Sequence, residues 1–144
     1  MNLANELCKD HEVIVAAGEG DGKMWKLLAP SIKREEISSL HRALSPINEI
    51  KTLFALRRLY GKYKPDIIHL HSSKVGILGR IAFPKLKIVY TVHGFDSIRI
   101  AYRQYLPLER ILQGYCKMIV GVSEYDGWNL RGEGIRRNVR VIYN

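Results

Sequence analysis

The stretch DIIHLHSSKVGILGRIAFPKLKIVYTVHGFD, residues 66–96, contains two short apolar runs on either side of a Gly-containing amphipathic segment. The runs at 66–70 and 87–92 are rich in β-branched and aromatic side chains, which is typical of buried strands. The segment at 73–83 has the length and apolar spacing of a helix. A strand, a helix and a second strand of these lengths predict a βαβ unit with parallel strands.

Strand and helix signals alternate along the rest of the chain as well. Toward the N-terminus we predict a helix at 1–9, a strand at 12–17, a weak strand at 26–29, a loop at 31–45 and a helix at 46–63. Toward the C-terminus we predict a helix at 107–117, a strand at 118–122, a Ser123-capped helix to 131 and a strand at 138–143. This order predicts an α/β, Rossmann-like three-layer α/β/α fold with a mostly parallel sheet, in a single domain covering residues 1–144.

Two of the predicted helices carry packing signals. Gly76 and Gly79, three residues apart, indicate that the helix at 73–83 lies close to the sheet. The helix at 46–63 has an apolar face that is made of Ile47, Ile50, Leu53, Phe54 and Tyr60.

Composition narrows the class of protein. The chain has 144 residues, 47% of them hydrophobic, and no apolar run near the length that spans a membrane. Two cysteines are too few for a disulfide framework, so we expect reduced thiols and a cytoplasmic location. The net charge of +9 suggests an anionic partner: nucleic acid, an acidic membrane face or a phosphorylated substrate.

Polar side chains follow three successive predicted strands at the point where each strand ends. The carboxyl ends of parallel strands share one edge of the sheet, and open α/β sheets bind their ligands there. We therefore expect a ligand site at this edge, made of His71, Ser72, Lys74, His93, Gly94, Asp96, Arg99 and Ser123.

The histidines of this edge leave two interpretations open. His69 and His71 are two apart on a strand and point to one face, so His93 on the next strand can join them. Three imidazoles suggest a metal-dependent hydrolase. Nearby carboxylates are sparse, however, which favours no metal and a packing role for His69. A neutral His93 beside Gly94 can bind a sugar hydroxyl or carry a proton.

Read together, these segments resemble the N-terminal, acceptor-side domain of family 4 glycosyltransferases of the GT-B fold. The resemblance rests on DIIHLHSSKVGILGRIA, KIVYTVHGFD, LERILQGYCKMIVGVSEYD and VIYN, and so covers nearly the whole chain. HSSKVGILGR and YTVHGFD are most similar to the bacterial capsular and exopolysaccharide enzymes that act on lipid-linked acceptors.

The resemblance implies transfer of a sugar from a nucleotide-sugar donor with retention, without an obligatory metal or other cofactor. It implies His93 as the catalytic residue in the cleft. It also implies that His71, Ser72, Lys74, Asp96 and Ser123 lie on the acceptor side, toward a lipid-linked or glycan acceptor.

The sequence departs from the family at both ends. Members open with a strand and a Gly-rich loop, whereas Met1 already begins a predicted helix, so we expect a gap in the sheet. The chain stops at the linker, Asn144, without the nucleotide-sugar-binding domain and its paired glutamates. We therefore expect a fragment that is inactive alone, because oriented charge at the leaving phosphate is a large part of such catalysis.

The basic surface predicts a peripheral contact with the anionic inner face of the cell membrane. We expect no nucleic-acid partner, since no stacking platform or recognition-helix motif occurs. A non-catalytic basic α/β binding module is the remaining alternative. The hypothesis of a Rossmann dehydrogenase has less support still, because the GxGxxG fingerprint is absent.

Overall fold

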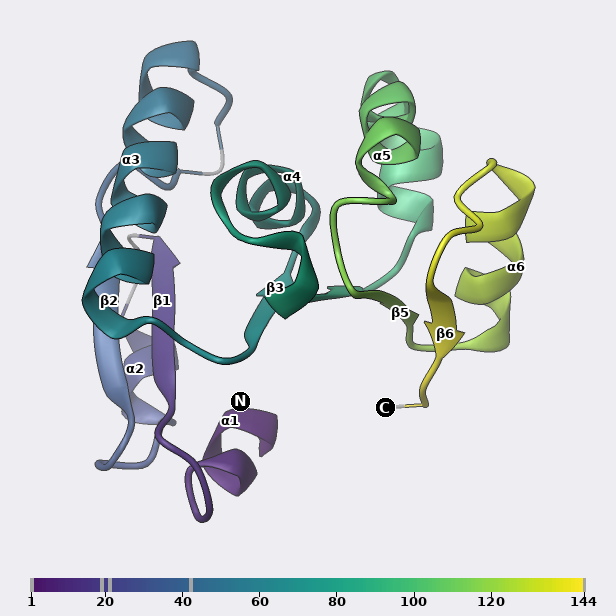
Figure 1. Ribbon diagram of the computed structural model, residues 1–144. Helices are drawn as coiled ribbons and strands as arrows, with labels where there is room; N and C mark the ends of the chain where they lie inside the picture. The colour runs from purple at the N-terminus through teal and green to yellow at the C-terminus, as the bar shows by residue number, and fades with distance from the viewer. Residues whose placement is uncertain (1, 19, 21, 42, 144) are drawn as a thin grey trace. The chain divides into compact units, whose positions relative to one another are not determined.

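A computed structural model describes residues 2–18, 20, 22–41 and 43–143 (Figure 1). Contacts divide the chain into two compact units, Met1–Ala55 and Leu56–Asn144, which are described separately here. The described strands form two parallel sheets, one in each unit. The predicted α/β class, with parallel strands and Rossmann-like alternation of strands and helices, is confirmed.

The first unit contains a two-stranded parallel sheet. Helix α1 (Asn2–Leu7) precedes strand β1 (Ile14–Gly18), helix α2 (Lys23–Lys26) and strand β2 (Lys33–Ile37), and β1 pairs with β2 from Ile14 opposite Lys33. The predicted weak strand at 26–29 is wrong, because α2 and a turn occupy that region. The predicted loop at 31–45 is also wrong in part, because it contains β2.

Helix α3 (Pro46–Tyr63) has the bounds that the sequence predicted, and much of its predicted apolar face is exposed. Thr52 and Leu56 are the buried residues, at 0% and 4% exposure. The buried hydroxyl of Thr52 forms a 2.8 Å hydrogen bond with the hydroxyl of Ser39. The apolar side chains of Ile47, Ile50 and Phe54 are exposed.

The second unit contains a four-stranded parallel sheet in the order β3-β4-β5-β6. Its elements are β3 (Ile68–His71), α4 (Ser73–Ala82), β4 (Ile88–Val92), α5 (Leu106–Leu112), β5 (Met118–Gly121), α6 (Glu124–Gly132) and β6 (Val139–Val141). A π-helical turn (Ser97–Ala101) and a 3₁₀ turn (Arg103–Tyr105) lie between β4 and α5. Helix α5 ends five residues before the predicted end at 117.

The core of the second unit lies between its sheet and the helices that follow each strand. Ile88 and Tyr90 of β4 are almost fully buried, as is Ile119 of β5. A Cβ on Gly76 would collide with the Tyr90 ring, and one on Gly79 would lie 2.6 Å from Leu70 Cδ1. The predicted close approach of α4 to the sheet is thus confirmed.

Two further findings bear on the composition. Cys8 and Cys116 are free thiols, and Cys116 is buried. Within the described residues, every helix is too short or too polar to cross a lipid bilayer.

Candidate functional site

The strand register places the predicted site residues at one edge of the four-stranded sheet. His71, the last residue of β3, is opposite Thr91, and Val92 at the end of β4 is opposite Gly121 of β5. The segments that follow these strands therefore start at nearly the same level. With His71 at the end of β3, these segments carry Ser72 to Lys74, His93 to Asp96 and Ser123 to Asp126.

Three histidines meet at this edge, as the alternation of β3 predicted. The rings of His69 and His71 are 4.0 Å apart between centroids. Nδ1 of His71 lies 3.2 Å from Nε2 of His93, within hydrogen-bonding distance, and these two rings are stacked. His69 Nε2 is 2.6 Å from Thr91 Oγ1, so this imidazole has a buried hydroxyl as its partner. His93 is exposed to solvent.

The histidine cluster disfavours positive charge. Burial, followed by the charges of His69 and His93, lowers the pKa of His71 from 6.5 to about 4. Burial, followed by the charge of His93, also lowers the pKa of His69. At neutral pH His69 and His71 are therefore neutral imidazoles, which can each donate one hydrogen bond and accept another.

Two backbone positions at this edge have positive φ. Gly94 has φ 69°, a conformation that glycine adopts readily, and no heavy atom would contact an added Cβ there. Ser72 has φ 94° and ψ 147°, which is unusual for a residue with a side chain. Ser72 is the N-cap of α4, yet its hydroxyl makes no capping hydrogen bond. The Ser72 side chain is exposed and does not cap the helix.

Asp96 is held in place by two neighbours. Arg99 Nε donates a 2.9 Å hydrogen bond to Asp96 Oδ1, and the Tyr125 hydroxyl donates a 3.0 Å hydrogen bond to Oδ2. The hydrogen bond from Arg99 is the largest cause of the lowered pKa of Asp96, and the Tyr125 hydroxyl adds to it. The result is an oriented, partly exposed carboxylate on the segment that follows His93.

Ser123 caps α6, as predicted, and its partner Asp126 connects this cap to the segment after β4. Ser123 Oγ accepts a hydrogen bond from the Asp126 amide and donates one to Asp126 Oδ2. The other oxygen, Oδ1, accepts a 3.0 Å hydrogen bond from the Phe95 amide. The Ser123 hydroxyl is therefore used within α6, and its predicted contact with substrate stays a prediction.

Asp126 was missed by the interpretation of the sequence. Ser123-Glu-Tyr-Asp126 matches the spacing of a capping box, in which a carboxylate three residues after the cap returns to the helix start. That signal locates the helix start. It does not indicate that the same carboxylate also binds a neighbouring loop.

The other predicted site residues are brought together less closely. Lys74 lies in the first turn of α4 and is partly buried. Arg99 is paired with Asp96. Among the residues that the structure describes, no group of three histidine, cysteine, aspartate or glutamate side chains is arranged to hold a metal ion.

Sequence comparisons relate this chain to known glycosyltransferases. The sequence profile of Glycosyltransferase Family 4 matches residues 1–144. A "UDP-Gal:alpha-D-GlcNAc-diphosphoundecaprenol alpha-1,3-galactosyltransferase" from Escherichia coli is 38% identical over 57% of this chain and 24% of its own length. An uncharacterised 41.2 kDa protein in the cps region of Klebsiella pneumoniae is 30% identical over 82% of this chain and 38% of its own length. The chain therefore spans less than half the length of these relatives.

Proposed function

This chain belongs to Glycosyltransferase Family 4, and we propose that it forms the acceptor-binding part of a retaining glycosyltransferase. The enzyme transfers a sugar from a nucleotide-sugar donor to a lipid-linked or polysaccharide acceptor. The single observation that supports this site most strongly is the His71–His93 pair at the ends of two adjacent strands. It places an exposed imidazole, supported by a second one, where open α/β sheets bind ligands.

In this proposal His93 is the catalytic residue. It contacts the sugar that is transferred, either as a hydrogen-bonding partner of a hydroxyl or as a carrier of a proton. His71 holds one nitrogen of His93 through the 3.2 Å contact and so fixes the position of the ring. Gly94 has no side chain to block a close approach of the substrate to the backbone.

The residues around His93 bind the substrates. Asp96 presents a carboxylate that Arg99 and Tyr125 keep ionised and oriented, which suits recognition of sugar hydroxyls. The exposed hydroxyl of Ser72 lies next to His71 in the chain. Lys74 and Ser123 complete the proposed substrate-binding set.

The acceptor is inferred from a relative. The Escherichia coli protein is named for a sugar acceptor linked to diphosphoundecaprenol. By this similarity we propose a lipid-linked acceptor for the present protein, at the inner face of the cell membrane. Most contacts with the nucleotide part of the donor are assigned to a part of the protein outside residues 1–144.

The proposal is tested in the protein encoded by the complete reading frame that contains this chain. The assay supplies membranes that contain polyprenyl-diphosphate-linked sugars as acceptors and radiolabelled nucleotide sugars as donors. It measures the transfer of radiolabel to the lipid-linked acceptor. We expect His93→Ala to lower the rate of transfer by about 100-fold or more, the usual range for loss of a positioned acid–base group. His11→Ala, on the exposed turn after α1, is the matched control and keeps the parental rate. Unchanged turnover in His93→Ala would exclude His93 from the site.

A further inference from the structure

Asp126 is a buried carboxylate in the first turn of α6, with 5% exposure. Its Oδ1 accepts a 3.0 Å hydrogen bond from the Phe95 amide, and its Oδ2 accepts a 2.8 Å hydrogen bond from the Ser123 hydroxyl. Both donors are neutral, so no cation offsets the burial of this carboxylate, as Arg80 does for Glu109. Burial at this cost indicates a role beyond packing.

The cap of α6 does not account for this carboxylate. Ser123 Oγ accepts its hydrogen bond from the main-chain amide of Asp126, which any residue except proline would supply at this position. The side chain of Asp126 instead joins α6 to the segment after β4, because Oδ1 binds an amide 31 residues earlier in the chain. The helix cap and the loop contact can therefore be separated by substitution at position 126.

The amide that Asp126 binds follows the most permissive backbone position of this segment. Gly94 has φ 69° and open space around an added Cβ, so sterics alone leave its backbone several conformations. The hydrogen bond to Asp126 fixes the orientation of the peptide that joins Gly94 to Phe95, because a peptide group is planar. His93 is thus restrained through its main chain from this side and through its ring by His71.

Other contacts of the segment do not replace this one. The Phe95 ring is buried in the core, at 1% exposure, and that contact restrains the side chain. The Tyr125 hydroxyl donates a hydrogen bond to the Asp96 carboxylate, which joins two side chains one residue further on. Of these three contacts, only that of Asp126 involves the backbone next to Gly94.

We propose that Asp126 is a positioning residue for sugar transfer. Through the Phe95 amide it holds Gly94 in the conformation that keeps His93 directed at the sugar. The inference rests on the proposed function, in which His93 contacts the transferred sugar, and it adds a residue that does not itself touch substrate. A displacement of about 1 Å at a reacting group can lower a rate by about 100-fold. Asp126 therefore affects the rate of transfer more than the binding of the nucleotide sugar.

Two nearly isosteric substitutions test this role in the protein encoded by the complete reading frame. Asp126→Asn keeps one oxygen as an acceptor for the Phe95 amide, and its NH₂ group can donate to Ser123 Oγ. Asp126→Leu fills the space without an acceptor, and both variants retain the main-chain cap. In the transfer assay we expect Asp126→Leu to lower kcat by at least about tenfold, with little change in the KM for the nucleotide sugar. Asp126→Asn should restore most of the rate.

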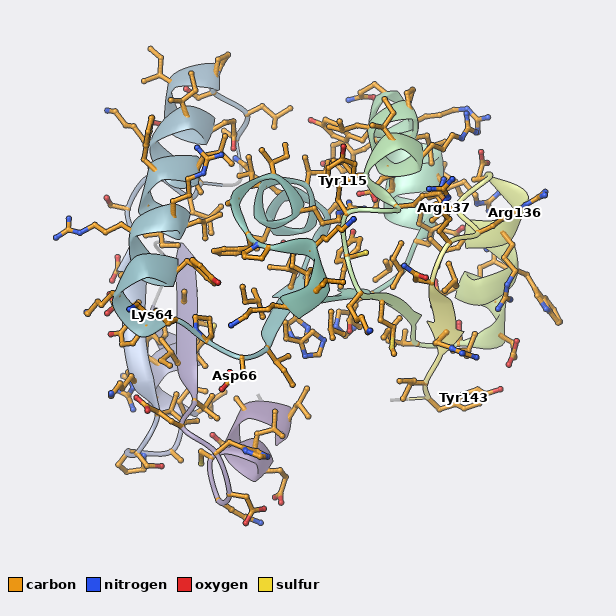
Figure 2. The ribbon with its side chains drawn as sticks, in the orientation of Figure 1. Lys64, Asp66, Tyr115, Arg136, Arg137 and Tyr143 are labelled. Carbon is orange, nitrogen blue, oxygen red and sulfur yellow. The ribbon has the colours of Figure 1, made fainter. Side chains whose placement is uncertain are left out.

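Two controls separate positioning from a loss of stability. Leu112→Ala removes a buried side chain of α5 that lies outside the core cluster around Phe95, so it should destabilise the protein but keep kcat. Tyr143, labelled in Figure 2, donates a 3.4 Å hydrogen bond to Glu124, which lies in the same turn of α6 as Asp126. Tyr143→Phe removes that hydrogen bond and should also keep kcat.

A second measurement does not depend on transferase activity. In protein with isotope-labelled phenylalanine, the Phe95 amide is identified by its absence from Phe95→Leu, and NMR follows its hydrogen exchange. We expect exchange at least about tenfold faster in Asp126→Leu, the effect of losing one hydrogen bond to a charged group, and nearly parental exchange in Asp126→Asn. The ring signal of His93, identified by its absence from His93→Ala, should shift in Asp126→Leu and return in Asp126→Asn.

Several outcomes would overturn the proposal. They are parental kcat in Asp126→Leu, equal losses in Asp126→Leu and Asp126→Asn, and a loss of similar size in Leu112→Ala. Unchanged exchange of the Phe95 amide and an unmoved His93 signal in Asp126→Leu would overturn it too. Parental transfer by His93→Ala would instead contradict the proposed function, and the exchange rate would still decide whether Asp126 fixes this segment.

Discussion

At the scale of single residues, the histidine cluster couples the candidate site to pH. His71 has a pKa of about 4 in the folded chain, against 6.5 for an ordinary histidine. Between these values the unfolded chain binds a proton that the folded chain excludes. Stability is therefore fully present above about pH 6.5 and falls as the pH drops toward 4. His69, whose pKa is lowered as well, acts in the same direction.

We expect the midpoint of thermal unfolding to fall between pH 7.5 and pH 5, and His71→Gln to reduce this fall. Glutamine keeps a polar side chain at position 71 but does not titrate, so the proton linkage is lost. Differential scanning calorimetry across this range checks the prediction. A His71→Gln variant with the original pH dependence would contradict the assignment.

At the scale of elements, the contact between α4 and β4 depends on the absence of a side chain at Gly76. An added methyl group there would overlap the ring of Tyr90, which is 1% exposed. Gly61 on α3 is the opposite case, because no heavy atom lies within 4 Å of an added Cβ. The two glycines thus differ in packing while both lie in helices.

We expect Gly76→Ala to destabilise the chain by about 1–3 kcal/mol through overpacking, despite the better helix propensity of alanine. Gly61→Ala should instead stabilise it by about 0.5–1 kcal/mol, because only propensity changes there. Urea denaturation followed by circular dichroism compares the two variants with the parent. Equal effects of the two substitutions on the free energy of unfolding would show that Tyr90 does not prevent a side chain at position 76.

Elements with strong local signals could be predicted from the sequence. The bounds of α3 follow from Ser45-Pro46 at its start and Pro65 after its end. Strand β2 could not be recognised, because its sequence is KREEI and only Ile37 is buried. Its strand character comes from pairing with β1, a tertiary effect that overrides local composition.

The apolar face of α3 shows a second limit of sequence patterns. The spacing of Ile47, Ile50 and Phe54 is correct for a helix but does not reveal whether the stripe meets the core or solvent. Here the buried position is Thr52, whose hydroxyl has a partner in Ser39. At the candidate site the topology brought His71 and His93 together as expected, whereas Asp126 depends on a loop contact that no local pattern reports.

At the scale of the molecule, the larger unit encloses an ion pair between two helices. Arg80 of α4 and Glu109 of α5 are almost fully buried and form a hydrogen-bonded pair. The Arg80 guanidinium also lies 4.6 Å from the centroid of the Tyr90 ring. Burial raises the pKa of the Glu109 carboxyl, and the charge of Arg80 opposes this rise.

We expect Glu109→Leu alone to cost about 3–5 kcal/mol, because it leaves the Arg80 charge buried without a partner. The double variant Arg80→Met/Glu109→Leu should recover most of this loss, since a well-packed apolar pair can replace a buried ion pair. A double-mutant cycle in urea measures the coupling. Additive losses in the double variant would show that the two side chains do not depend on each other.

The Asp126 carboxylate links the segment after β4 to helix α6 at the candidate site. It binds the Phe95 amide with one oxygen and the α6 cap with the other, while Tyr125 reaches from the same turn to Asp96. The segment that carries Gly94 and Asp96 is therefore fastened to a helix at two points. In the proposed site, a displacement of this segment would therefore carry the first turn of α6 with it.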